Sequence, residues 1–133
     1  MSTKPPSAGP LWAPSSTRVA NSRLTDFARF CESNTDTRFA DYAALHAWSV
    51  DHADVFWESI WAYCDVLGHR GDTTLLDARK MPGAQFFPEA RINFAENLLR
   101  RKGEDPALVF RGEDQVRKAL SWDELHSLVS RLQ

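Results

Sequence analysis

The sequence lacks most features that mark catalytic, membrane-bound or nucleic-acid-binding chains. Its two cysteines, Cys31 and Cys64, do not form a Cys-x-x-Cys pair. No run approaches the roughly 18 apolar residues of a membrane span, and residues 1–10 lack the apolar centre of a signal peptide. Its 16 basic and 18 acidic side chains give a net charge of −2, so a nucleic acid gains no general attraction. We therefore expect a cytoplasmic protein that binds neither membrane nor nucleic acid.

Candidate catalytic groups are equally sparse. The histidines are not spaced three or four residues apart, so no helix face presents a pair of them to a metal: His46, His52, His69 and His126. The segment 68–71 is too short for a phosphate-binding loop, and no Gly-x-Ser-x-Gly elbow exists. Glu96 and Asn97 could line a site, but we expect them to bind backbone groups of a neighbouring segment. The sequence predicts no catalytic, cofactor-binding or metal-binding residue.

Both cysteines fall on the apolar side of an expected helix. This position favours buried, reduced thiols, although the sequence alone leaves a disulfide between two helices open.

The first half of the chain predicts a short tail followed by three helices. Four prolines in residues 1–14 predict an extended, poorly ordered tail with Leu11 and Trp12 as anchors. Apolar spacing predicts a helix from about Thr17 to Glu32, capped by Ser16. Asp41 should cap a second helix, and Asp51 a third that carries Asp54 in its first turn and ends at Gly68. Three tryptophans on these helices are expected in the core rather than stacked on bases: Trp48, Trp57 and Trp61.

The segment Met81–Arg100 is the most informative part of the sequence. After an expected short strand at residues 73–77, it combines a turn at Pro82 and Gly83, the aromatic pair Phe86 and Phe87, and a second turn at Pro88. Asn93 is expected to cap a helix that continues to about Lys102 and ends at Gly103. We call this segment the ribbon, and its pattern is typical of chain laid across the surface of a larger body.

The last residues predict a hairpin and a helix. The strands should cover residues 107–111 and 116–120, joined at Gly112, and Ser121 with Glu124 forms a capping box. The apolar positions of the following helix continue to the second-last residue: Leu125, Leu128, Val129 and Leu132. An isolated hairpin is marginal in water, so we expect these elements to be the opening of a domain whose remainder is absent.

We therefore expect a mixed α/β chain, mainly helical, in three parts. Residues 1–14 form the tail, residues 15–104 a helical region with the ribbon, and residues 105–133 the incomplete start of a further domain.

Three blocks of this sequence resemble the N-terminal region of acetoacetyl-CoA synthetases (acetoacetate–CoA ligases), in the superfamily of adenylate-forming acyl-CoA synthetases. They are Asp41–Trp57, the ribbon with its Asn93–Leu99 stretch, and residues 107–111 together with 120–125. The ribbon is fairly specific and favours the acetoacetyl over the acetyl branch. Two positions depart from the family pattern: Phe86 replaces a usual tryptophan, and Glu89 a usual glycine, which would strain the backbone if φ is positive there.

The resemblance implies a helical N-terminal extension joined to the start of an AMP-binding domain. The intact enzyme would use ATP, CoA and Mg²⁺ to convert acetoacetate to acetoacetyl-CoA through an acyl-adenylate. The family's phosphate-binding loop, acidic magnesium-binding residues and catalytic lysine lie downstream of this stretch. The resemblance therefore implies a structural, inactive piece that binds no cofactor and whose partner is the remainder of the AMP-binding domain. The alternatives are the same region of an acetyl- or propionyl-type synthetase, and a non-catalytic helical interaction module.

Overall fold

The computed structural model describes residues 12–113 and 115–132, and the chain divides into two compact units, residues 1–64 and 65–133. Most of the tail expected for residues 1–14, Leu11 included, lies outside the described residues. The mixed, mainly helical fold class is confirmed, with six helices and three two-stranded antiparallel sheets in the described chain.

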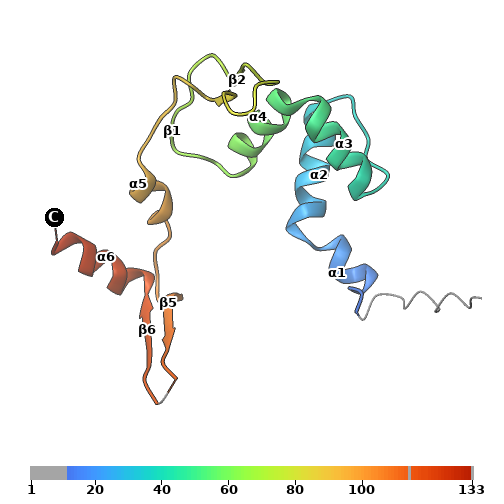
Figure 1. The fold of residues 1–133 in the computed structure, drawn as a ribbon. Helices are drawn as coiled ribbons and strands as arrows, with labels where there is room; N and C mark the ends of the chain where they lie inside the picture. The colour runs from blue at the N-terminus through green and yellow to red at the C-terminus, as the bar shows by residue number, and fades with distance from the viewer. Residues whose placement is uncertain (1–11, 114, 133) are drawn as a thin grey trace, which may run out of the picture. The chain divides into compact units, whose positions relative to one another are not determined.

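The first unit consists of four helices. They are α1 (Ser16–Ala20), α2 (Arg23–Asn34), α3 (Tyr42–Asp51) and α4 (Ala53–Tyr63), with α2, α3 and α4 packed together (Figure 1). The prediction of one helix over residues 17–32 is wrong, because Ser22 adopts an extended conformation (φ −76°, ψ 149°) and its side chain accepts a hydrogen bond from the Thr25 N–H. Ser15, rather than Ser16, caps α1. Serine hydroxyls thus start two helices where apolar spacing alone indicates one.

Asp41 caps α3 as predicted: its side chain accepts from the Ala44 N–H at 2.9 Å. The predicted cap at Asp51 is wrong, because Asp51 is the last residue of α3 and His52 begins α4 without a side-chain cap. Asp54 does lie in the first turn of α4. Gly68 does not end this helix, since Cys64 is its C-cap and Asp65 takes the left-handed turn at φ 51°.

The core of the first unit is small and aromatic. Four apolar side chains are buried: Phe27, Cys31, Leu45 and Trp48. The Phe27 ring meets Phe56 and Tyr63 edge-on, with centroids 5.8 and 5.2 Å apart, and Trp48 packs on Phe39. Trp48 is a core residue as predicted, but Trp61 is only half-buried and Trp57 is 39% exposed. The aromatic residues therefore serve mainly to hold three short helices together.

The two cysteines have different environments. Cys31 is fully buried, and desolvation raises the pKa of its thiol. Cys64 is exposed, so the expectation of two buried thiols is wrong for that residue. Its position as the C-cap of α4 places it beyond the packed face of the helix. The two thiols are not joined in a disulfide.

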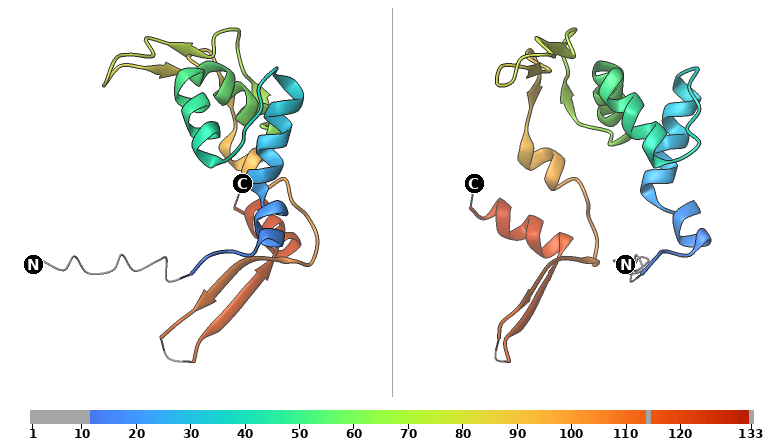
Figure 2. Two further views of the ribbon diagram at one scale, coloured as in Figure 1. Left: turned by 90° about the vertical axis from the view of Figure 1, so that its right-hand side faces the viewer. Right: turned by 45° about the vertical axis from the view of Figure 1, so that its right-hand side comes forward.

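The second unit contains the ribbon, a hairpin and the last helix. Strand β1 (Gly68–His69) pairs with β4 (Arg91–Ile92), and β2 (Leu75–Leu76) with β3 (Gln85–Phe86). Helix α5 (Phe94–Leu98) is shorter than predicted, because Leu99 forms its C-cap before Lys102 is reached. The hairpin of β5 (Pro106–Arg111) and β6 (Arg117–Ser121) precedes α6 (Trp122–Ser130), as Figure 2 shows.

The hairpin and capping box agree with the sequence prediction. Leu108 lies opposite Leu120, and Phe110 opposite Lys118, on paired strands. The Ser121 side chain accepts from the Glu124 N–H, and the Glu124 carboxylate accepts from the Ser121 N–H. This reciprocal cap satisfies two amides that the first turn of α6 would otherwise leave without partners.

Candidate functional site

The candidate catalytic side chains are dispersed in the structure. His46 lies on α3, His52 at the junction of α3 and α4, His69 in β1 and His126 on α6. Within residues 12–113 and 115–132, no three side chains of His, Cys, Asp or Glu come together as a metal site. In that same part of the chain, no helix combines the length and apolarity of a membrane span.

The first half of the ribbon consists of consecutive turns around β3, which pairs with β2. The Lys80 N–H donates to the Asp77 carbonyl, and the Ala84 N–H to the Lys80 carbonyl, around the predicted turn at Pro82 and Gly83. Phe86 pairs opposite Leu75, and its side chain is 48% exposed. Phe87 takes a left-handed conformation at φ 47° and donates its N–H to the Thr74 carbonyl at 2.8 Å. The aromatic pair thus sits where the backbone changes direction.

Glu89 organises the turn that follows. Its carboxylate accepts hydrogen bonds from the Asp72 N–H (2.8 Å), the Thr73 N–H (3.1 Å) and the Thr73 hydroxyl (3.0 Å). The bonds from Thr73 and Asp72 lower the pKa of Glu89. The positive φ of this turn is at Phe87, and Glu89 is not among the described residues with a positive φ, so the expected strain at Glu89 does not arise.

Asn97 holds α5 against the segment that enters the second unit. Its side-chain oxygen accepts from the Leu67 N–H, and its amide donates to the Leu67 carbonyl, both at 2.8 Å. The Arg100 guanidinium donates to the Asp65 carbonyl and lies 3.4 Å from the Asp65 carboxylate. The prediction that Asn97 binds the backbone of a neighbouring segment agrees with these contacts. Glu96 lies in the first turn of α5, where its negative charge interacts favourably with the positive end of the helix dipole.

The hairpin and α6 are joined to the chain after α5 by a few polar contacts. The Gly103 N–H donates to the Asp123 carboxylate at 2.8 Å, and His126 Nε2 lies 2.8 Å from the Arg101 carbonyl oxygen. The Arg101 guanidinium also stacks over the Trp122 ring, 5.6 Å from its centroid. His126 is therefore a structural contact of α6.

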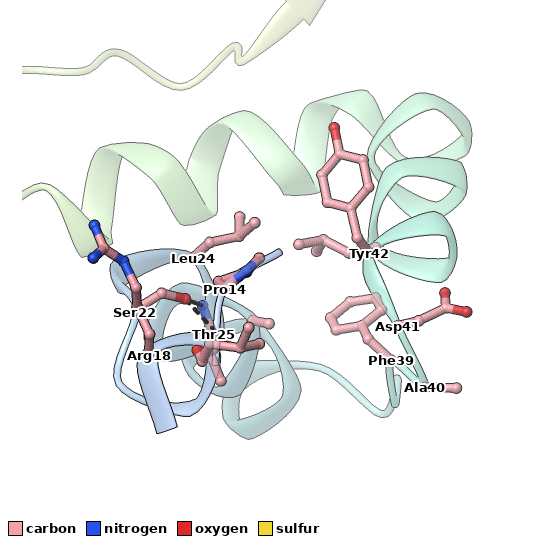
Figure 3. Close-up of a pocket in the computed structure, with 12 residues that line it drawn as sticks. Pro14, Arg18, Ser22, Leu24, Thr25, Phe39, Ala40, Asp41 and Tyr42 are labelled. Atoms are coloured by element: carbon pink, nitrogen blue, oxygen red, sulfur yellow. Dashed lines mark hydrogen bonds between the residues drawn. The ribbon is translucent and has the colours of Figure 1, made fainter. Parts of the chain in front are cut away.

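An apolar hollow of about 510 Å³ lies in the first unit (Figure 3). Side chains from α1, α2 and α3 and the loop before α3 line it, Leu24, Phe39 and Tyr42 among them. Two polar side chains in its wall are engaged locally: Ser22 and Thr25 bond each other at 3.0 Å, and Thr25 also donates to the Val19 carbonyl. The hollow offers apolar area without a converging set of polar groups, which is typical of a packing surface.

Comparison with known proteins shows which family the chain resembles and over which residues. Residues 42–98 match the model of the family described as "Acetyl-coenzyme A synthetase N-terminus". The chain is 50% identical to an acetoacetyl-coenzyme A synthetase of Rhizobium meliloti (strain 1021) over 124 residues, which are 93% of this chain and 19% of that protein. It is 35% identical to a malonamoyl-CoA synthetase of Penicillium aethiopicum over 100 residues, 69% of this chain and 14% of that protein.

A solved structure extends this similarity to the fold. The acetoacetyl-CoA synthetase from Streptomyces lividans superposes with a TM-score of 0.80 at 38% sequence identity, over 94% of this chain and 21% of that one. The chain thus spans about a fifth of the length of these two acetoacetyl-CoA synthetases. In sequence and in fold, the chain therefore corresponds to the N-terminal region of acetoacetyl-CoA synthetases.

Proposed function

We propose that the whole protein carrying this chain is an acetoacetate–CoA ligase. The acetoacetate carboxylate attacks the α-phosphate of ATP and releases pyrophosphate, and the CoA thiolate then displaces AMP from the acyl-adenylate. The observation that carries the proposal is the 50% identity to an acetoacetyl-coenzyme A synthetase over 93% of this chain. ATP, CoA and Mg²⁺ would be bound by residues outside this chain, in a protein of the cytoplasm.

The role proposed for the chain itself is structural. Successive side chains of a strand point to opposite faces, and β5 carries exposed apolar residues on both. Leu108 (51% exposed) and Phe110 (59%) lie on one face, and Val109 (63%) on the other. A two-stranded hairpin exposing apolar area on both sides gains stability when each side is covered. We take the remainder of the AMP-binding domain as the partner that covers it, with the domain boundary near residue 105.

Activity of the whole protein tests the reaction. Acetoacetate, acetate, propionate and malonamate should be compared for ATP- and CoA-dependent thioester formation, with kcat/KM measured for each. We expect acetoacetate to be used best, because the match to acetoacetyl-CoA synthetases covers more of the chain and at higher identity. A kcat/KM for acetate equal to or above that for acetoacetate would overturn the substrate assignment.

Assays on the 133-residue chain alone test whether its role is structural and the catalytic groups lie elsewhere in the whole protein. We expect no thioester formation from it and no heat of binding when it is titrated with ATP and Mg²⁺ in a calorimeter. The whole protein, titrated in parallel, provides the positive control. Tight nucleotide binding by the chain alone would contradict a purely structural role.

A further inference from the structure

Two segments of the second unit form two short antiparallel ladders, one at each end. Residues 68–76 and 85–92 pair at both ends, with Gly68 opposite Ile92 and Leu75 opposite Phe86. Between these ladders the first segment has five residues, 70–74, and the second has four, 87–90. The unequal lengths prevent a regular ladder here, so the backbone amides of this stretch need other partners.

Glu89 supplies those partners at the interruption. The Asp72 and Thr73 N–H groups donate to one oxygen of its carboxylate at 2.8 and 3.1 Å, and the Thr73 hydroxyl donates to the other at 3.0 Å. Beside them, the Phe87 N–H donates to the Thr74 carbonyl. Bonds to an ionised acceptor are stronger than neutral ones, so one side chain holds the middle of the pair together.

Gly71 makes this close approach feasible. A Cβ atom on residue 71 would lie 2.6 Å from the Glu89 Cβ and 2.6 Å from its carboxylate oxygen. Gly71 also has a φ of +81°, which side-chain-bearing residues rarely adopt. Glu89 can therefore occupy this position only because residue 71 has no side chain.

We propose that Glu89 is a positioning residue whose carboxylate joins the β1–β4 and β2–β3 ladders into one continuous antiparallel pair. Beside the Phe87–Thr74 bond, the carboxylate supplies the Asp72 and Thr73 amides with an acceptor that the interrupted ladder does not. On this view the two ladders open together, and the carboxylate sets the course of the ribbon between Phe86 and Arg91.

Amide hydrogen exchange followed by NMR on the 133-residue chain tests this coupling. The variants are Glu89→Ala, which removes the acceptors, and Glu89→Gln, which has similar size and keeps one acceptor oxygen. The matched control is Glu104→Ala, because Glu104 is an exposed carboxylate in the same unit.

In Glu89→Ala we expect the Asp72 and Thr73 amides to exchange at least about tenfold faster, with faster exchange in both the β1–β4 and the β2–β3 ladder as well. Glu89→Gln should fall between the wild type and Glu89→Ala, and Glu104→Ala should match the wild type. Unchanged exchange at Asp72 and Thr73 in both Glu89 variants would overturn the proposal. Faster exchange at these two amides with either ladder unaffected would equally overturn it, because the carboxylate would then not couple the two ladders.

Discussion

Replacing Phe27 with alanine should remove most of the stability of the first unit. Phe27 is 6% exposed and contacts Phe56 and Tyr63, both on α4, through the edges of their rings. Its loss leaves a cavity between α2 and α4. The loss also removes the ring around which the two α4 aromatics are arranged.

The expected magnitude follows from the size of the unit. Phenylalanine-to-alanine substitutions in cores cost about 3–5 kcal/mol. A unit of roughly 50 residues at about 0.05–0.15 kcal/mol per residue has a total stability of only about 3–8 kcal/mol. Phe27→Leu keeps most of the apolar volume and loses the ring-edge contacts, which contribute about 0.5–1.5 kcal/mol. The two substitutions should therefore differ by about 1.5 kcal/mol or more.

Urea unfolding followed by circular dichroism measures these differences, and hydrogen exchange in α2 and α4 locates them. The control is Val50→Ala on α3, because Val50 is 64% exposed and such substitutions change stability by about 0.5 kcal/mol or less. An unfolding free energy for Phe27→Ala within about 1 kcal/mol of the wild type would refute the assignment of this core.

Three further outcomes are expected. Ser121→Ala should destabilise α6 by about 1 kcal/mol through loss of the capping box, seen as faster amide exchange in its first turn. Glu89 has a folded pKa below its unfolded value, so its contribution is present above the unfolded pKa and is lost as pH falls through the folded pKa. An acid titration of the amides that it binds should show this loss in the wild type, and a flat response in Glu89→Gln would confirm the source. A thiol reagent at mildly alkaline pH should modify exposed Cys64 rapidly and buried Cys31 only on unfolding; rapid modification of both in the folded chain would contradict the burial of Cys31.

Features set by neighbouring residues could be predicted from the sequence. The capping box of Ser121 and Glu124 depends on atoms three residues apart, and the hairpin depends on two short strands around Gly112. Asp41 and Asn93 cap their helices for the same local reason. In each case the hydrogen-bond partner lies within one helical turn or one strand pair, so the pattern contains the whole interaction.

Helix boundaries are harder to predict from the sequence than helix caps, because a local polar contact competes with apolar spacing. Ser22 interrupts an apolar pattern that continues through it, and Asp65 turns the chain three residues before the glycine expected to do so. Cys64 falls on the extrapolated apolar face of a helix that has already ended at Tyr63. Apolar periodicity therefore identified which helices exist better than where they stop.

The residue types of the ribbon predict that Asn97 binds a neighbouring backbone segment, but no local pattern indicates which segment it is, or that Glu89 and Arg100 also bind backbone groups. Glu89, Asn97 and Arg100 bind backbone groups 16 to 35 residues earlier in the chain, a pairing that no local pattern contains. Several apolar side chains of the ribbon remain exposed, among them Phe86 at 48% and Phe94 at 74%. The polar side chains thus fix the course of the ribbon within the chain itself. The exposed apolar side chains leave apolar surface area that a second surface can cover, as the proposed structural role in a larger ligase requires.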